Sequence, residues 1–536
     1  MAATADASRT TTASKRRRPR PARPARAIMV LGTASHVGKS VLTAALCRIF
    51  KQDGLSVAPF KAQNMALNSA ATPEGLEIGR AQAMQAEAAG LPASVDMNPI
   101  LLKPCAEARS QLVVHGRVTG ELEARDYHRR RVTELFDLVV DSYRRLAARH
   151  DVIVLEGAGS PAEVNLAATD IVNMRMARAA EASCLLVADI DRGGVFASLV
   201  GTMALLSPAD RRRIRGFAVN RFRGDAALFQ PGVDILEQRL RRPCLGVVPF
   251  LRDLGLDEED SVALETARTP REAWPDEVGA ARRLRVGVVA FPHIANFTDV
   301  DPLAAEPSVA VAFVRRADDL ARADLVILPG SKQTIDDLDW LEREGFRDAL
   351  ARHVARGGLV VGVCGGMQML GREVRDPEGM EGGGARAGLG LLALTTVLDR
   401  DKVTRRARAA LEGAALFGQP VAADAIDIDG YEIHLGRTDA EPGARPLFRL
   451  RREGAASDVD DGAQDASGRV VGTYLHGLFD ADAFRHALLR AARATLALGP
   501  PAALAPYTAA REARFDRLAD HVRTALDVKA LAGWIR

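Results

Sequence analysis

Residues 27–54 read AIMVLGTASHVGKSVLTAALCRIFKQDG and contain an apolar strand, a glycine-rich turn and an amphipathic helix, in that order. The apolar run at 27–32 is short enough for a buried strand, and the helical pattern ends at Gly54. Between them, the turn GTASHVGKS (32–40) is of the kind whose backbone N–H groups cradle phosphate oxygens at the positive end of a helix. This order predicts an α/β fold with a phosphate site at its first turn.

The turn assigns roles to its own residues. Lys39 is expected to neutralise the β- and γ-phosphates of ATP, and the Ser40 hydroxyl is expected to bind Mg²⁺. Gly32, Thr33 and Gly38 complete the predicted ATP-binding set, since glycines let the backbone approach the ligand. Five residues separate the two glycines, one more than in the standard P-loop, so the turn is a variant form.

Further apolar strands alternate with helical stretches along the chain. They lie at 56–61, 151–159, 182–190, 216–222 and 244–250, and then at 284–291, 323–331, 357–371 and 469–479. Such alternation predicts two doubly wound α/β domains, each with a mainly parallel sheet covered on both faces.

Breaks in composition divide the chain. We expect a disordered basic tail at 1–26, a first domain at 27–255, a linker at 256–283, a second domain at 284–495 and a helical tail at 496–536. Two polar, glycine-rich stretches of the second domain, 377–388 and 454–468, are expected to be surface loops.

Composition excludes several classes of protein. With 536 residues, 47% of them hydrophobic, the chain supports full cores and is not disordered as a whole. It has no run near ~18 apolar residues, so no membrane span is expected. The five cysteines are scattered and never form a CxxC motif, which argues against disulfides or zinc and favours the cytoplasm.

The basic charge is confined to the N-terminus. Residues 1–27 hold eight basic side chains and one acidic one, while the whole chain has a net charge of +3, so the remainder is net negative. The folded part therefore shows no bias toward nucleic acid. Whether the tail is a nucleic-acid arm, a targeting segment or only a solvated tail stays open.

Three acidic residues follow predicted strands of the first domain. Glu156 comes after four apolar residues and before Gly-Ala-Gly, a place where Mg²⁺ ligation together with Ser40 explains the charge better than a solvent-facing side chain does. Asp189 and Asp191 end another strand, where they either join the same site or cap the next turn.

Cys364 lies in VGVCGGMQ, at the end of a buried strand and before glycines and a helix. This is a nucleophile-elbow arrangement, in which the helix N-terminus favours a thiolate. The N–H groups of Gly365 and Gly330 are the expected oxyanion donors, and His476 in TYLHGLF, after a later strand, is the expected base. The alternative for a lone cysteine is a small core residue.

At this point the motifs resemble known families. GTASHVGKS is similar to the loop of the dethiobiotin synthetase group, where a strand-end glutamate, here Glu156, helps to hold Mg²⁺. VGVCGGMQMLG and TYLHGLF resemble the triad-type glutamine amidotransferases. Ordinary members carry a glutamate two residues after the histidine, where this chain has Leu478; that departure matches the cobyric and cobyrinic acid synthases. Asp480 and Glu432 are candidates to orient the histidine.

The resemblance extends to the segment FKAQNMALNS (60–69) and to FPHIANFTDVDPL (291–303), which look like the cobyric acid branch of that family. It implies amidation of the b, d, e and g carboxylates of adenosylcobyrinic acid a,c-diamide, with ATP, Mg²⁺ and glutamine. In the first segment, the expected substrate-binding residues are Lys61, Gln63, Asn64 and Asn68.

Other functions stay open. A cobyrinic acid a,c-diamide synthase or another ATP-dependent carboxylate amidase would share this architecture. A P-loop ATPase switch, or a binding module with a degenerate amidotransferase domain, would not need a Cys-Gly-Gly elbow together with a strand-end histidine. The expected partners are the corrinoid, glutamine and ATP, without nucleic acid or membrane, and the oligomeric state is open.

Overall fold

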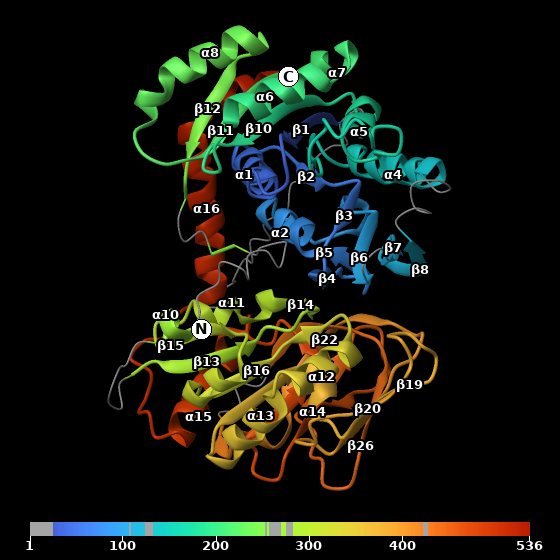
Figure 1. Cartoon of the computed structure of the whole chain (residues 1–536), viewed down its shortest axis with the longest axis vertical. Helices are drawn as coiled ribbons and strands as arrows, with labels where there is room; N and C mark the ends of the chain where they lie inside the picture. The colour runs from blue at the N-terminus through green and yellow to red at the C-terminus, as the bar shows by residue number, and fades with distance from the viewer. Residues whose placement is uncertain are drawn as a thin grey trace, which may run out of the picture.

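The computed structural model describes residues 25–106, 109–123, 132–251, 255–256, 270–274, 282–421 and 427–535. Of the expected basic tail only residues 25–26 fall in these ranges, and the expected linker is described at 256, 270–274 and 282–283. Two α/β halves stand end to end (Figure 1). In the described ranges, no helix is long and apolar enough to cross a membrane.

The first half is built on six parallel strands in the order β12-β11-β10-β1-β9-β2. Their bounds are Arg26–Gly32 (β1), Val57–Phe60 (β2), Val152–Glu156 (β9), Ser183–Asp189 (β10), Ile214–Phe222 (β11) and Cys244–Pro249 (β12). All six runs that the sequence predicts in this half are strands of this one sheet. Because β1 is central, the turn that follows it opens at the carboxyl edge of the sheet, where open α/β sheets bind ligands.

Both faces of this sheet are covered. Successive side chains of a strand point to opposite faces, and β1 is apolar from Ala27 to Leu31. Ile28 and Val30 therefore enter one core, while Met29 and Leu31 enter another. The helices are Lys39–Gln52 (α1), Arg80–Ala88 (α2), Val132–Ala147 (α4), Met174–Ala179 (α5), Val195–Leu205 (α6), Pro208–Arg213 (α7) and Gln230–Leu240 (α8).

The C-terminus returns to the first half. The long helix α16 (Tyr507–Ala525) runs beside α1 and contributes Phe515, Leu518 and Val522 to the core that holds Ile28 (Figure 1). The last helix, α17, spans Val528–Trp534. The end of the chain therefore ties the two halves together.

The second half has its own six-stranded sheet, in the order β15-β13-β16-β18-β30-β29, parallel except for the edge strand β29. Its strands are Leu284–Val289 (β13), Val309–Val314 (β15), Leu325–Leu328 (β16), Leu359–Val363 (β18), Ala463–Gln464 (β29) and Val470–Thr473 (β30). Its helices are Thr334–Arg343 (α12), Phe346–Ala355 (α13), Gly365–Leu370 (α14) and Asp482–Thr495 (α15). The prediction of two mainly parallel α/β domains is confirmed.

Smaller sheets surround these two. They are β3-β6-β7-β8 (Gln63–Met65, Ile100–Ala106, Arg109–Val114, Arg117–Glu123), β20-β19-β21-β26 (Gly384–Ala387, Glu373–Asp376, Leu394–Val397, Arg437–Ala440) and β28-β27-β22-β25-β31 (Val459–Asp461, Phe448–Arg452, Val403–Leu411, Ile428–His434, Leu475–His476). The pairs β4-β5 (Ser69–Ala71, Glu77–Gly79), β14-β17 (Ile294–Ala295, Gly330–Ser331) and β23-β24 (Ala415–Leu416, Gln419–Pro420) complete them.

The structure corrects the prediction that 377–388 and 454–468 are surface loops. The stretch 377–388 contains β20, and the stretch 454–468 contains β28 and β29. These strands are short and half polar, and all four residues of β20 are exposed, so no apolar run marked them.

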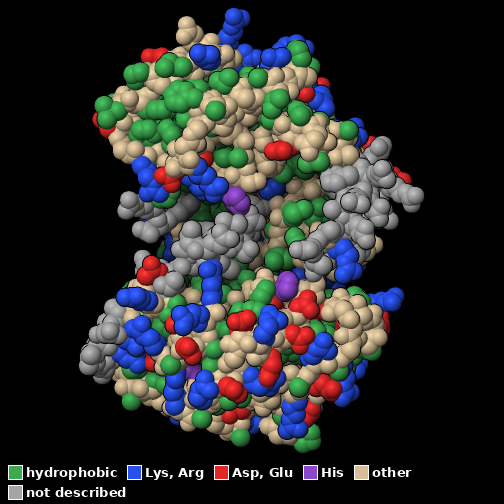
Figure 2. Space-filling model, in the orientation of Figure 1, with side chains coloured by type: hydrophobic (Ala, Val, Ile, Leu, Met, Phe, Trp, Pro, Cys, Tyr) green, Lys and Arg blue, Asp and Glu red, His purple; other side chains and the backbone are tan. Residues whose placement is uncertain are grey.

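The two halves lie one above the other in Figure 2, and polar contacts join them. Asn68 accepts a hydrogen bond from the backbone N–H of Asn296 (2.8 Å), and the Asn296 side chain accepts one from the Ser69 N–H (2.9 Å). Beside them, Lys402 of the second half forms an ion pair with Glu77 of the first (2.5 Å). All of these groups except the half-buried Lys402 are buried, so they fix the position of one half relative to the other.

Candidate active site

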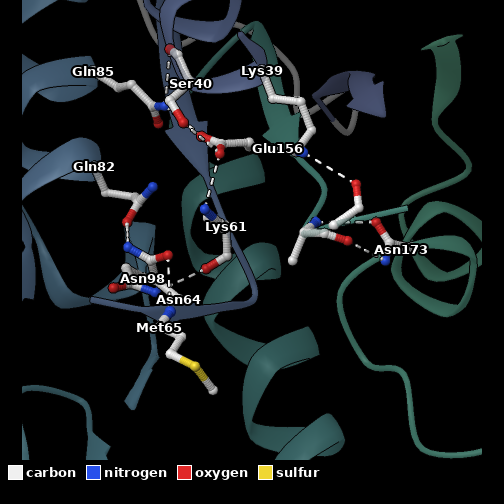
Figure 3. Close-up of polar contacts among 12 residues, drawn as sticks. Lys39, Ser40, Lys61, Asn64, Met65, Gln82, Gln85, Asn98, Glu156 and Asn173 are labelled. Carbon is white, nitrogen blue, oxygen red and sulfur yellow. Dashed lines mark hydrogen bonds and ion pairs between the residues drawn. The ribbon is translucent and has the colours of Figure 1, made fainter. Parts of the chain in front are cut away.

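The phosphate turn lies between β1 and α1, as expected. Gly38 has φ +95°, a left-handed conformation that favours glycine, and a Cβ on Gly32 would lie 2.9 Å from the Lys39 ammonium. Lys39 folds back over the turn and donates to the carbonyls of Ala34 (2.9 Å) and Gly159 (3.1 Å; Figure 3). A phosphate that enters the turn offers the lysine charged oxygens instead of these carbonyls.

Glu156 does not face solvent; it is buried at the carboxyl end of β9. One carboxylate oxygen accepts from the Ser40 hydroxyl (2.8 Å) and from Lys61 (2.9 Å), and the other accepts from Gln85 of α2 (2.6 Å; Figure 3). The structure therefore brings together the two residues that the sequence proposed for Mg²⁺. Hydroxyl and carboxylate oxygens are the hard ligands that this ion takes, so the donor set fits.

The two aspartates after β10 have local partners. Asp189 accepts from the Asp191 N–H (2.8 Å) and from Arg221 (3.1 Å), and Asp191 pairs with Arg223 (2.6 Å) at the surface. Their contacts match the turn-capping interpretation.

The expected substrate segment is mostly buried. Lys61 faces Glu156, and Asn64 donates to Gln82 of α2 (3.0 Å; Figure 3). Asn68 is buried against the other half, and Gln63 lies half-buried in β3. Asn64 and Asn68 thus hold the segment and the interface, whereas Lys61 lies next to the residues of the phosphate site.

Cys364 follows β18 at the elbow that the sequence predicts. It has φ +54°, which is strained for a residue with a side chain, and its N–H donates to Thr473 of the neighbouring strand (2.8 Å). The turn packs tightly against the loop after β16, since a Cβ on Gly365 would lie 2.8 Å from the Ser331 nitrogen. The thiol is buried and donates to the Ile433 carbonyl (3.3 Å).

His476 lies on β31. The third member of the site, after Cys364 and His476, is Asp299, which the sequence analysis does not single out. The Nδ1 atom is 2.6 Å from the Asp299 carboxylate, which also accepts the Gly477 N–H (3.3 Å). The expected candidates are corrected: Glu432 is engaged by Arg452 through two hydrogen bonds (2.7 and 2.8 Å), and the histidine nitrogen goes to Asp299 rather than to Asp480.

The electrostatics of this pair favour a charged histidine. Burial lowers the pKa of His476, but the Asp299 carboxylate and the Cys364 sulfur raise it more, to about 10. The Nε2 atom is buried and has no hydrogen-bond partner in the described part of the chain. An imidazolium there stabilises a thiolate at Cys364, which is the reactive form of the residue.

A pocket opens beside Cys364 and His476, with about 520 Å³ of empty space including its mouth. Gly330 lines it, so the structure brings both expected catalytic residues and one expected oxyanion donor to one cavity, while Gly365 stands next to Cys364 at the start of α14. Charged side chains from both halves also line it: Lys103, Lys332, Glu381 and Lys402.

Comparisons with known proteins match each half of the chain to a domain family. Residues 28–262 match the CobQ/CobB/MinD/ParA nucleotide binding domain, and residues 285–484 match the CobB/CobQ-like glutamine amidotransferase domain. A solved structure described as a glutamine amidotransferase is 18% identical, covering 40% of this chain and 97% of its own, with a TM-score of 0.28.

Two curated relatives match nearly the whole chain. A cobyric acid synthase of Sorangium cellulosum is 51% identical over 510 residues, which cover 93% of this chain and 96% of the relative. A cobyric acid synthase of Syntrophobacter fumaroxidans is 49% identical over 514 residues, covering 95% and 98%. With both domains matched and such identity end to end, the chain belongs to the cobyric acid synthase family.

Proposed function

We propose that this enzyme amidates the b, d, e and g carboxylates of adenosylcobyrinic acid a,c-diamide, using ATP and glutamine, to give cobyric acid in cobalamin biosynthesis. One observation carries the proposal: a phosphate turn and a Cys–His–Asp site lie in two docked halves of one chain. The relatives that match the chain along its length are cobyric acid synthases, which supports the choice of substrate.

The second half releases ammonia. The Cys364 thiolate attacks the side-chain amide carbon of glutamine, and N–H groups of Gly330 and Gly365 stabilise the oxyanion. His476 gives its proton to the leaving nitrogen, so ammonia departs and a thioester remains. Water, activated by the neutral His476, then hydrolyses the thioester to glutamate, and Asp299 holds the imidazole in the correct orientation throughout.

The first half activates the acid. Gly32, Thr33 and Gly38 shape the cradle for the ATP phosphates, and Lys39 leaves its two carbonyl partners to pair with them. Ser40 and Glu156 would hold Mg²⁺, whose charge offsets that of the phosphates when it is bound.

The substrate carboxylate attacks the γ-phosphorus, which gives an acyl phosphate and ADP. Lys61, next to Glu156, is placed to pair with the reacting carboxylate. Ammonia then attacks the acyl carbon, and phosphate leaves as the amide forms. Since water would hydrolyse the acyl phosphate, the docked halves serve to exclude it from the ammonia path.

Mass spectrometry of the corrinoid product tests the proposal. After incubation with ATP, Mg²⁺ and glutamine labelled at its amide nitrogen, we expect labelled nitrogen at all four positions of cobyric acid. Turnover of cobyrinic acid but not of its a,c-diamide would identify an a,c-diamide synthase instead. ATP hydrolysis that ignores both glutamine and corrinoid would identify an ATPase switch.

A further inference from the structure

A buried ion cluster forms one wall of the pocket beside Cys364. Lys103 of the first half and Lys402 of the second pair with the same carboxylate, Glu77, at 2.7 and 2.5 Å. The side chains of the three residues are 5, 12 and 1% exposed, in that order. Lys103 also donates to the Ser69 hydroxyl (3.0 Å), so its ammonium is held in place.

This cluster carries more positive than negative charge. Two ammonium groups share one carboxylate, and an uncompensated charge in a buried site is unfavourable. Burial raises the pKa of Glu77, but the two lysines lower it more. The pKa therefore lies well below its usual range, and the carboxylate is ionised at neutral pH. Burial lowers the pKa of Lys402 to about 8, against the pull of Glu77. The cluster therefore holds two ammonium groups for one carboxylate and can accept a second anion.

Two further charged groups line the same pocket. The Lys332 ammonium has no hydrogen-bond or ion-pair partner among the residues that the structure describes. The Glu381 side chain is buried against the start of α12, where one carboxylate oxygen accepts a hydrogen bond from the Ile335 N–H (3.2 Å). Burial raises the pKa of Glu381 to about 7 despite the nearby charge of Lys332. In the described part of the chain, neither Glu381 nor the Lys332 ammonium forms an ion pair, while Lys103 and Lys402 share the single carboxylate of Glu77.

We propose that this charged wall binds the α-carboxylate and the α-ammonium of the glutamine whose side-chain amide reaches Cys364. Lys402, Lys103 and Lys332 take the carboxylate, and Glu381 takes the ammonium. The pocket thus selects a free amino acid, with both of its charged groups, over a glutamine within a peptide. The inference rests on the proposed role of Cys364.

The position of Lys103 gives this site a second property. It lies on β6 of the first half, while Cys364 lies in the second, so the glutamine site is complete only when the halves are docked. Release of ammonia is thereby restricted to the form of the enzyme that can use it.

Glutaminase kinetics with two donors test the inference. L-Glutaminamide keeps the side-chain amide and the α-ammonium but has a neutral amide in place of the α-carboxylate. In Lys402→Met and in Lys332→Met, we expect the KM for L-glutamine to rise about 10- to 100-fold, with a smaller change in kcat, because a charge-assisted contact is lost. The KM for L-glutaminamide should change less than about threefold, since the lost contact was never made.

Matched controls separate this outcome from a general defect. Arg408→Met removes an exposed cation of β22 and should leave the ratio of the two KM values at its original value. Glu381→Gln should raise the KM for L-glutamine but not that for glutaramate, which lacks the α-amino group. Lys332 has no partner to lose, so its variant reports on binding even where Lys402→Met folds poorly.

Equal changes in KM for both donors in Lys332→Met, or no change for either, would overturn the inference. A parallel measurement keeps the proposed function apart from it. Suppose that Cys364→Ser loses glutaminase activity while Lys332→Met keeps the wild-type ratio of the KM values for L-glutamine and L-glutaminamide. Then only the proposed role of the charged wall is wrong. If Cys364→Ser keeps glutaminase activity, the proposed function is wrong, and so is the inference about the charged wall that depends on it.

Discussion

The phosphate turn at 32–40 and the cysteine turn at 364–366 occupy the same place in the two halves, since each follows a central strand of a parallel sheet. The two turns differ in whether their functional groups are already arranged for chemistry before a ligand binds. In the phosphate turn, Lys39 and Ser40 bond to groups of the protein that a nucleotide would replace. In the cysteine turn, a strained backbone and a buried Cys–His–Asp set are complete without a ligand.

The difference follows from what each turn binds. A triphosphate brings its own negative charge, so the protein needs only N–H groups and a mobile cation near it. A thiolate is made by the protein, and its charge must be stabilised before glutamine arrives, which takes a fixed imidazolium and a carboxylate behind it. The phosphate site is therefore completed when its ligand binds, whereas the cysteine site is completed by the packing of the protein itself.

The most severe way to break the second site is Cys364→Ser. Glutamine-dependent amidation should fall by about 10⁴-fold or more, because the hydroxyl is a far weaker nucleophile than the thiolate here. Amidation driven by ammonium chloride should persist, because the phosphate turn is untouched. Product analysis with the two nitrogen sources measures both, and loss of both in a folded protein would contradict the separation of the sites.

Asp299→Asn tests whether the remote carboxylate orients His476. We expect glutaminase kcat to fall by about 10²- to 10⁴-fold, since an amide neither stabilises the imidazolium nor fixes its tautomer. Steady-state kinetics with glutamine give the value, and ammonium-driven amidation is the control. A variant with wild-type kcat would show that the contact is structural only.

The same variant has a signature in pH. The pKa of His476 is raised from 6.5 to about 10, so the pair stabilises the fold fully below pH 6.5 and less as pH rises toward 10. The difference in unfolding free energy between wild type and Asp299→Asn should therefore shrink across that window, as urea unfolding at several pH values would show. A constant difference would mean that His476 is neutral throughout.

Lys39→Ala breaks the first site instead. Removing an ammonium that pairs with phosphate should lower amidation by about 10²-fold, and by the same factor with glutamine or ammonium chloride, because both routes need the acyl phosphate. The ratio of the two rates is the measurement. Retention of ammonium-driven amidation would refute the ATP assignment.

Sequence predicts the first site better than the second for a physical reason. The phosphate turn is local: strand, glycines, Lys39 and Ser40 are contiguous, and Glu156 stands out as a charge at the end of an apolar strand. The sequence predicts the six buried parallel strands of the first half for the same reason, since buried strands read as continuous apolar runs. The short, half-polar strands β20, β28 and β29 carry no such run, so the sequence predicts loops where they lie.

The third member of the cysteine site could not be found by spacing. Asp299 is 177 positions from His476 and sits in a 3-10 turn, Phe297–Val300, that only the fold brings to β31. The family likeness of the segment FPHIANFTDVDPL is the signal in the sequence that points near Asp299. In the amide-rich segment at 60–69, Asn68 contacts the second half, and the sequence does not show which side chains a distant part of the fold covers.

The smallest expected effect concerns the link between the two sites. Tyr431 stacks on His476 with ring centroids 5.4 Å apart, and its hydroxyl contacts Arg80 at the start of α2, the helix whose Gln85 holds Glu156. Tyr431→Phe keeps the ring but removes the hydroxyl, so glutaminase activity should fall only several-fold, about 1 kcal/mol for one hydrogen bond. We also expect ATP and corrinoid to stimulate the glutaminase activity of the wild type through this contact. That stimulation should fall in the variant, because Arg80 of α2 no longer contacts the residue beside the histidine. Glutaminase rates with and without the acceptor substrates measure this, and a variant that keeps full stimulation would mean that the two turns communicate by another route.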